Sequence, residues 1–363
     1  MFYYFLYPLH KIIPIFNVLK YITFRAGMAT ITAFVLSLWL GPRLINKLKA
    51  LKIGQEIRKE DDSAVLYNLH EKKQGTPTMG GLLILLAIIA ANVLWADILN
   101  KYVIIACLGT VWLGVIGFFD DYLKIIRKKS KGLSAKNKLA WQMFLGLILG
   151  IIFILDPHLS TKLDIPFLKD VTVNLGFFYI LFVILIIVGS SNAVNLTDGL
   201  DGLAIGIVIM VVVAFSILSY VTGNIKFSGY LLIPYIPESG ELTVFCASIL
   251  GAGLGFLWFN CYPASVFMGD TGSLALGGAL GLVAIMIKKE LLLVVVGGVL
   301  VLETFSVMLQ VGSFKLTKKR IFKIAPLHHH FQFMGWPETK VIVRFWIIAA
   351  LFALLTLVTL KLR

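Results

Sequence analysis

Carboxylates, an amide and histidines gather at four places that border strongly apolar segments. They are Asp120 and Asp121 in GFFDDYLK, Asn195, Asp198 and Asp201 in SSNAVNLTDGLDGLA, Asp270 in FMGDTGSLALGG, and His328, His329 and His330 in APLHHHFQF. Acidic residues and histidines are costly beside apolar runs and usually have a functional reason to be there. Clustered carboxylates favour Mg²⁺ through oxygen ligands, and phosphoryl transfer needs a metal and basic side chains to neutralise charge. The pattern predicts Mg²⁺-dependent chemistry on an anionic phosphate.

Asp270 has the sharpest local pattern. Gly269 and Gly272 flank it, and a helix is expected to begin just after it. Such a helix start would offer free backbone N–H groups and a positive end beside a carboxylate, which suits metal and phosphate together. A plain helix cap is the alternative role for Asp270.

The other aspartates also have structural alternatives. Asp198 follows Thr197 at an expected helix start, so N-capping would explain it as well. Asp198 and Asp201 are three residues apart and share a face if they are helical. Adjacent Asp120 and Asp121 point about 100° apart on a helix, so they cannot both do one job.

Several further polar or aromatic residues carry weaker signals. Three consecutive histidines are also compatible with a solvated loop, and Asn260 and Phe267 with plain packing. Glu303, Ser306 and Gln310 give one apolar segment a polar face, where a structural hydrogen bond between helices is as reasonable as a substrate contact.

The composition predicts that apolar helices position these residues. Of 363 residues, 59% are hydrophobic and 14% are charged, against ~25% charged in ordinary soluble domains. This excludes a soluble globular, a disordered or a disulfide-stapled secreted protein. The three cysteines have no CxxC spacing and border apolar runs, so neither a disulfide nor a metal site is expected from them.

At ~20 residues per crossing, the chain is expected to form one all-α membrane domain over residues 1–363. The apolar segments lie near 23–42, 78–96, 102–121, 138–155, 175–190, 199–220, 242–259, 271–287, 291–312 and 341–360.

The net charge of +14 is interpreted first as a topology signal. Alternate loops divide the basic residues into 20 on one side and 10, with both termini, on the other. Because positive charge prefers the cytoplasm, both termini are predicted outside. The four polar clusters then all fall on the cytoplasmic side, which favours one site there, and no nucleic acid is expected as a partner.

Five motifs together resemble a known family of membrane enzymes. They are GTPTMGG (75–81), GFFDDYLK (117–124), NAVNLTDGLDGLA (192–204), FLWFNCYPASVFMGDTGSLALGG (256–278) and PLHHHF (326–331). This set resembles the polyprenyl-phosphate N-acetylhexosamine-1-phosphate transferases over roughly residues 25–363. The unbroken histidine run and GWPETKVIVRFWII (335–348) are similar to the branch that transfers phospho-N-acetylmuramoyl-pentapeptide.

The resemblance implies a reaction and its setting. Phospho-MurNAc-pentapeptide would pass from UDP-MurNAc-pentapeptide to undecaprenyl phosphate, giving lipid I and UMP with Mg²⁺, in peptidoglycan synthesis. It also implies ten spans, a homodimer and a place in the bacterial cytoplasmic (inner) membrane, with the active site on the cytoplasmic face.

The resemblance also implies residue roles. Asp270 matches the metal-binding aspartate, and Asp120 and Asp121 match a pair near the metal and the lipid phosphate. The catalytic set is therefore expected to be Asp120, Asp121, Asp270 and His328. The substrate-binding set is expected to be Lys73, Lys124, Lys136, Asn195, Asp198, Asp201, Asn260, Phe267, Gln310 and His329, with Phe267 stacking on uracil.

Two alternatives remain open at this point. A sister transferase would use another UDP-N-acetylhexosamine in the same family. A cation-coupled or proton-coupled transporter would also use membrane carboxylates, but it predicts acids near mid-span in matching halves, whereas these acids gather at one end. Gln332 departs from the family pattern, which often has an acidic residue there.

Overall fold

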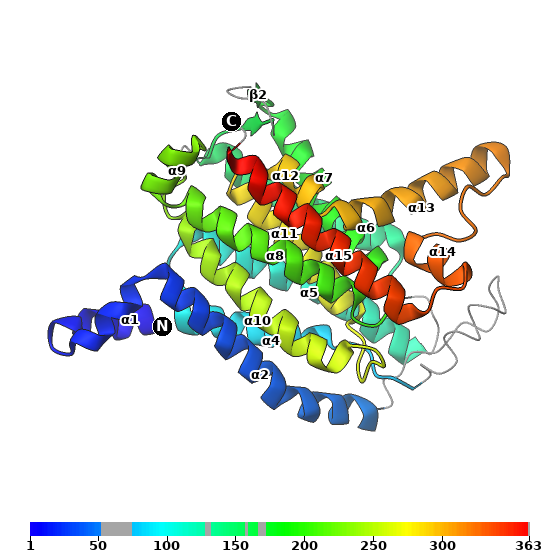
Figure 1. Cartoon of the computed structure of the whole chain (residues 1–363), viewed down its shortest axis with the longest axis horizontal. Coiled ribbons are helices and arrows are strands. Elements are labelled where there is room, and N and C mark those ends of the chain that lie inside the picture. The colour runs from blue at the N-terminus through cyan, green and yellow to red at the C-terminus, as the bar shows by residue number, and fades with distance from the viewer. Residues whose placement is uncertain (52–74, 128–131, 157–158, 166–171, 362–363) are drawn as a thin grey trace.

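The computed structural model describes residues 1–51, 75–127, 132–156, 159–165 and 172–361 (Figure 1). Over these residues the chain is almost entirely helical, with one antiparallel two-stranded hairpin. The α-helices are α1 (Phe2–Phe5), α2 (Ile22–Ala50), α4 (Gly81–Trp95), α5 (Lys101–Arg127), α6 (Ala135–Leu155), α7 (Phe178–Thr197), α8 (Leu203–Thr222), α9 (Ile225–Leu231), α10 (Leu242–Asn260), α11 (Gly269–Met286), α12 (Glu290–Val296), α13 (Gly298–Thr317), α14 (Leu327–Phe333) and α15 (Glu338–Val358). The short 3-10 helices of the described residues are η1 (Tyr7–Lys11), η2 (Pro14–Lys20), η4 (Ser239–Glu241) and η5 (Thr359–Lys361). The strands are β1 (Lys162–Asp164) and β2 (Thr172–Asn174).

The helical membrane fold confirms the class predicted from composition. Nine helices in the described part of the chain are long and apolar enough to cross a membrane: α2, α5, α6, α7, α8, α10, α11, α13 and α15, with the α10 segment counted from Ser239. The predicted segment near 78–96 is α4, which is apolar but only 15 residues long.

One predicted segment, 291–312, differs from the structure because it is two helices. α12 ends at Val296, Gly297 takes a non-helical backbone conformation (φ −86°, ψ 20°), and α13 starts at Gly298. Glycine weakens a helix interior because it has the most backbone freedom to lose, and hydropathy alone does not detect such a break. The far end of α13 stands clear of the other helices in Figure 1.

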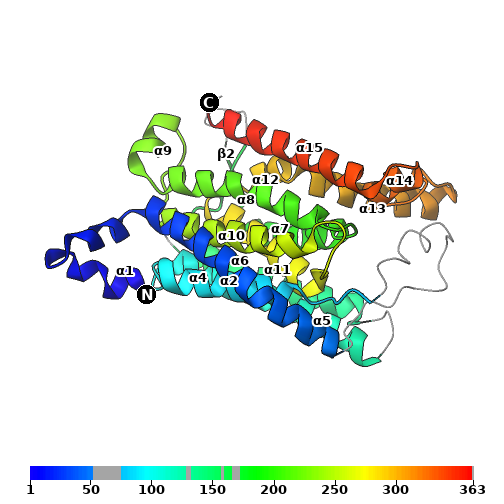
Figure 2. The same ribbon diagram turned by 60° about the horizontal axis from the view of Figure 1, so that its bottom comes forward.

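Helix α11 forms the centre of the bundle. Of the residues of α11, 89% are buried, and the helix packs on α4, α5, α7 and α8. The many glycines and alanines of this helix allow its neighbours to approach closely. Because α11 is central, the residue at its first turn, Asp270, lies within reach of the ends of α5, α6 and α7. Figure 1 and Figure 2 both place α11 near the middle of the bundle.

The two ends of the bundle differ in what they carry. Both termini, the hairpin and α9 lie on the left side of Figure 1, and α14 with its histidines lies on the right. Apolar side chains along α5, α6 and α7 are exposed on the outer surface, for example Leu108, Phe144 and Leu181. An apolar outer surface of this kind is suited to contact with the hydrocarbon chains of lipids.

Candidate active site

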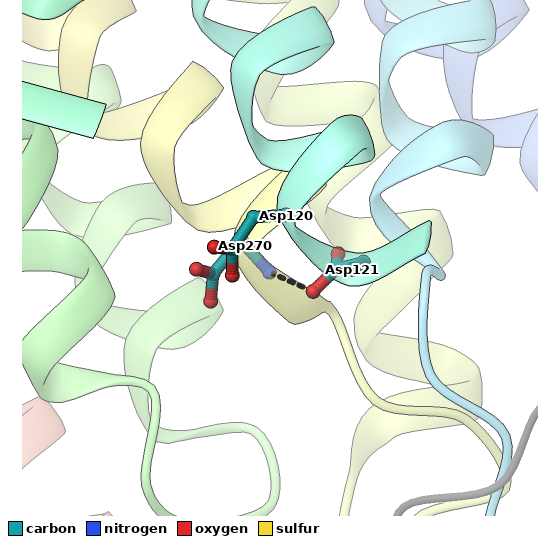
Figure 3. Close-up of side chains that lie close together, drawn as sticks. All are labelled: Asp120, Asp121 and Asp270. Carbon is teal, nitrogen blue, oxygen red and sulfur yellow. Dashed lines mark hydrogen bonds between the residues drawn. The ribbon is translucent and has the colours of Figure 1, made fainter. Parts of the chain in front are cut away.

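Three aspartates from two helices meet at the start of α11. Asp120 and Asp121 lie near the end of α5, and Asp270 lies in the first turn of α11 (Figure 3). One oxygen of each carboxylate lies within 4.8 Å of the others. The side chains of Asp120 and Asp121 are 2% and 3% exposed, and that of Asp270 is 15% exposed. The structure thus brings together acids that are 150 residues apart in the sequence.

Asp270 is held by contacts from three other helices. The amide of Asn195, on α7, donates to Asp270 Oδ1 at 2.9 Å and to Ser273 Oγ at 2.8 Å. Lys138 Nζ, on α6, lies 2.5 Å from Asp270 Oδ2, and Lys124 Nζ, on α5, lies 3.4 Å from the same oxygen. Asp270 therefore shares a small volume with two ammonium groups and one amide.

Asp120 and Asp121 make different contacts, as their helical spacing predicted. Asp120 Oδ1 accepts the backbone N–H of Leu133 at 2.8 Å, and its Oδ2 lies 2.6 Å from Lys124 Nζ and 3.3 Å from Lys138 Nζ. Asp121 instead accepts hydrogen bonds from the backbone N–H groups of Asp270 and Thr271. Asp120 faces the lysines, whereas Asp121 faces the α11 backbone.

These contacts correct the expectation of free N–H groups at the start of α11. The helix begins at Gly269, so Asp270 lies inside its first turn and is not its cap. The two N–H groups beside the carboxylate are occupied by Asp121. The positive charge in contact with the Asp270 carboxylate therefore comes from the ammonium groups of Lys124 and Lys138.

Lys138 contacts the site carboxylates, whereas Lys136 is the residue predicted from the sequence. Lys136 is exposed, whereas Lys138, two residues later, faces the carboxylates. Two residues on a helix point about 200° apart, so only one of them can face the site. The signal was present in the buried stripe of α6, because Lys138 is four residues before the buried Gln142 and seven before Leu145.

The turn between α7 and α8 holds Asp198 and Asp201, and capping does not explain Asp198. α8 begins at Leu203 with Gly202 as its cap residue, so the N-cap interpretation of Asp198 is wrong. Burial raises the pKa of the Asp198 carboxyl to about 8, and the carboxylates of Asp270 and Asp121 act in the same direction. The raised pKa shows that Asp198 lies buried beside other carboxylates, surroundings that disfavour its charged form.

Asp201 and Asn260 hold the loop that carries Phe267. Asp201 Oδ2 accepts the backbone N–H of Ala264 at 3.0 Å. Asn260 accepts the N–H of Gly202 and donates to the carbonyl of Val266. Both side chains are buried. Their hydrogen bonds named here are to backbone groups of the loop and the turn. Phe267 itself is partly exposed at the end of this loop.

The histidine segment is a short helix and not a solvated loop. His328 and Glu303 are both fully buried, and His328 Nδ1 lies 3.2 Å from Glu303 Oε2. The backbone N–H of His328 donates to the other oxygen of Glu303 at 3.2 Å. A Cβ at Gly199 would overlap His328 Nε2, so this ring packs directly on the 198–202 turn. Glu303 therefore ties α14 to the bundle.

The remaining predicted site residues have separate positions. His329 Nδ1 lies 2.9 Å from Gln332 Oε1. Gln310 uses both ends of its amide on the backbone of 321–322, accepting from Ile321 and Phe322 and donating to the Phe322 carbonyl. It thereby fixes the chain that leads to α14. Lys73 lies outside the described residues.

The acidic cluster has the ligand chemistry that a hard divalent cation requires. It offers three buried or partly buried carboxylates close together, and oxygen ligands are what Mg²⁺ prefers. Two lysines and three aspartates leave the immediate cluster with a net negative charge. The ammonium groups of Lys124 and Lys138 occupy the oxygens that a cation would share.

Comparisons with known proteins identify the family of the chain. The model of glycosyl transferase family 4 matches residues 103–288, and signature 1 of phospho-N-acetylmuramoyl-pentapeptide-transferase matches residues 73–85. Relatives of that name match over the whole of their own length. The protein of Citrifermentans bemidjiense is 53% identical over 100% of this chain, that of Methylacidiphilum infernorum 53% over 99%, and that of Oleidesulfovibrio alaskensis 50% over 100%. The chain belongs to the phospho-N-acetylmuramoyl-pentapeptide-transferase family.

The family signature has a visible structural role in this chain. Within it, the N–H groups of Gly80 and Gly81 donate to the carbonyls of Phe267 and Met268 at 2.8 and 2.9 Å. The N–H of Phe267 in turn donates to the Pro77 carbonyl at 2.8 Å. The signature segment of this phospho-N-acetylmuramoyl-pentapeptide-transferase family therefore pairs with the chain entering α11 and helps to place both Phe267 and Asp270.

Proposed function

We propose that the chain transfers phospho-MurNAc-pentapeptide from UDP-MurNAc-pentapeptide to undecaprenyl phosphate, producing lipid I and UMP. The observation that carries this proposal is the full-length identity of up to 53% with relatives named for that transfer. The cluster of carboxylates and lysines at the start of α11 supplies chemistry suited to a pyrophosphate substrate.

The basic and acidic residues of the cluster have different proposed roles. Lys124 and Lys138 neutralise the incoming phosphate and the pyrophosphate, and Asn195 orients Asp270. Asp270, with Asp120 beside it, would hold Mg²⁺. The bound ion would withdraw charge from the pyrophosphate oxygens. Phe267 is assigned to uracil, and His328 and His329 to the pyrophosphate and sugar side.

The charge of the acceptor favours direct attack. A phosphate monoester has a second pKa of about 6, so undecaprenyl phosphate is mostly dianionic at neutral pH. Most acceptor molecules then carry no proton on the phosphate, so a general base is not needed to activate it. An oxygen of the lipid phosphate attacks the phosphorus that carries the sugar, and the bond from that phosphorus to the UMP oxygen breaks. UMP leaves with the bonding electron pair.

Substrate competition tests the proposal against the sister-transferase alternative. Purified enzyme with undecaprenyl phosphate and Mg²⁺ is given equal concentrations of UDP-MurNAc-pentapeptide and UDP-GlcNAc, each with a different label. Label from the MurNAc-pentapeptide donor is expected in the lipid product. Label from UDP-GlcNAc in that product would assign the chain to a different transferase.

The place of the enzyme is proposed as the bacterial inner membrane, as a homodimer, with the site facing the cytoplasm. The motive for the orientation is the charge asymmetry of the loops. In a variant with Cys261→Ser, which removes the exposed native thiol, a cysteine at Lys319 should react with an impermeant reagent only after the cytoplasmic face is opened. A cysteine at Lys226 should react in sealed, right-side-out vesicles. Light scattering of the purified protein tests the dimer.

A further inference from the structure

The Asp121 carboxylate reaches from α5 onto the first turn of α11. Its Oδ1 accepts the backbone N–H of Asp270 at 3.2 Å. Its Oδ2 accepts both the backbone N–H of Thr271 at 3.0 Å and the Thr271 hydroxyl at 2.8 Å. The side chain is 3% exposed. All three of these hydrogen bonds are made to Asp270 and Thr271, so they fix the backbone from which the Asp270 side chain extends.

These N–H groups need a partner from outside their own helix. The first four N–H groups of an α-helix have no acceptor within it, and α11 has no side-chain cap of its own. A buried N–H without a partner costs free energy comparable to a lost hydrogen bond, and Thr271 is fully buried. Asp121 therefore acts as the cap of α11, supplied by another helix.

Two glycines allow this approach. Gly269 has a φ of +73°, and a Cβ there would lie 2.6 Å from Asp121 Oδ2. Gly117 lies one turn before Asp121 on α5, and a Cβ there would overlap the Asp270 carbonyl. The end of α5 and the start of α11 thus meet backbone to backbone, with the Asp121 carboxylate closing the contact.

The capacity of the carboxylate is largely used by these contacts. A carboxylate offers about four lone-pair sites, and three of them are occupied by α11. Lys124 Nζ lies 3.7 Å from Oδ1, in the remaining space. Asp120, in contrast, turns its Oδ2 toward both lysines. Asp120 and Asp270 are left to face a ligand.

We propose that Asp121 is a positioning residue that fixes the first turn of α11, and through it Asp270, without touching substrate or metal. The Thr271 hydroxyl, which donates to Asp121 Oδ2, contributes to the same positioning. The consequence for turnover rests on the proposed transferase function, whereas the structural contact does not.

Hydrogen exchange at the start of α11 tests the contact directly. The amides of Asp270 and Thr271 are followed by mass spectrometry in full-length enzyme in detergent, without metal or substrate. Asp121→Asn should accelerate their exchange by at least ~10-fold, because a charge-assisted hydrogen bond is lost. Asp120→Asn removes the same charge one residue away but contacts neither amide, so it should leave their exchange unchanged.

Metal binding and kinetics separate positioning from ligation. Electron paramagnetic resonance of Mn²⁺ should show that Asp121→Asn weakens binding far less than Asp270→Asn does. Thr271→Val and Asp121→Asn should each lower kcat more than they raise KM, and Thr271→Ser should keep turnover near that of the wild type. If Asp121→Asn does not fold, the Thr271 pair still tests the contact through exchange and kinetics. Unchanged exchange in Asp121→Asn and Thr271→Val, or a loss of Mn²⁺ binding in Asp121→Asn equal to that of Asp270→Asn, would overturn the proposal.

Discussion

Lys138 in the first turn of α6 lies 2.5 Å from the carboxylate of Asp270 in the first turn of α11. The two residues are 132 positions apart. The packing of α6 on α7 and of α7 on α11, together with α5, which packs on both α6 and α11, brings these two helix starts together. An ammonium group in this position can neutralise charge that develops on a phosphate near Asp270.

Replacing Lys138 with glutamine should lower kcat strongly. Removing one donor that stabilises developing charge typically costs ~10²–10³ in kcat. Lys136→Gln should cost much less, because that side chain is exposed. Steady-state rates of UMP release measure both, with Lys47→Gln, at an exposed position on α2, as the charge control. A larger loss at Lys136 than at Lys138 would favour the assignment made from sequence.

Phe267→Ala should raise KM for the UDP substrate more than it lowers kcat. Stacking contributes ~1–3 kcal/mol per base, which corresponds to a loss of roughly 5- to 150-fold. Phe267→Tyr keeps a flat ring and should stay near wild type. An unchanged KM in Phe267→Ala would remove this residue from the nucleotide pocket.

Glu303→Ala should destabilise the folded protein as well as impair turnover. It leaves the buried backbone N–H of His328 without its acceptor and removes the carboxylate oxygen 3.2 Å from His328 Nδ1. Loss of the acceptor costs about 1–3 kcal/mol. Thermal unfolding in detergent measures the shift in Tm. Glu303→Gln retains one acceptor oxygen and should be less affected. Equal Tm values for wild type and Glu303→Ala would mean that the contact contributes nothing to stability.

Features set by neighbouring residues in the sequence could be predicted, whereas features set by contacts between distant segments could not. Hydropathy predicts the spans because each crossing needs its own length of apolar residues, and the charge asymmetry places the polar clusters at one end. Hydropathy does not detect the break at Gly297, and the choice of Lys138 over Lys136 depends on packing against other helices. Periodicity in α6 held part of that information, since Lys138 continues the stripe of Gln142 and Leu145.

The partners of the aspartates were harder to predict. Helical spacing showed that Asp120 and Asp121 must do different things, but not which of them would meet α11. That choice depends on the close contact allowed by Gly117 and Gly269. Likewise, Asp198 follows a residue that ends a helix, and local sequence could not distinguish that position from a helix start five residues later.

Direct attack predicts that UMP exchange needs the lipid acceptor. Without undecaprenyl phosphate, wild-type enzyme should not exchange labelled UMP into UDP-MurNAc-pentapeptide, since no phospho-sugar remains on the protein for UMP to recapture. The preparation must be stripped of endogenous lipid, because trace acceptor would allow exchange by simple reversal. Robust exchange in lipid-free enzyme, lost in Asp270→Asn, would defeat direct attack in favour of a covalent intermediate on a carboxylate.

The most direct measurement of the central claim is the joint appearance of lipid I and UMP as Mg²⁺ is titrated, in wild type, Asp270→Asn and Asp198→Asn. Asparagine keeps the shape of Asp270 but removes the charge that would hold the ion. We predict equal amounts of the two products from wild-type enzyme, dependent on Mg²⁺. Asp270→Asn should give no turnover while remaining folded, and its loss should exceed that of Asp198→Asn. Wild-type rates and unchanged Mg²⁺ dependence in Asp270→Asn would contradict the account.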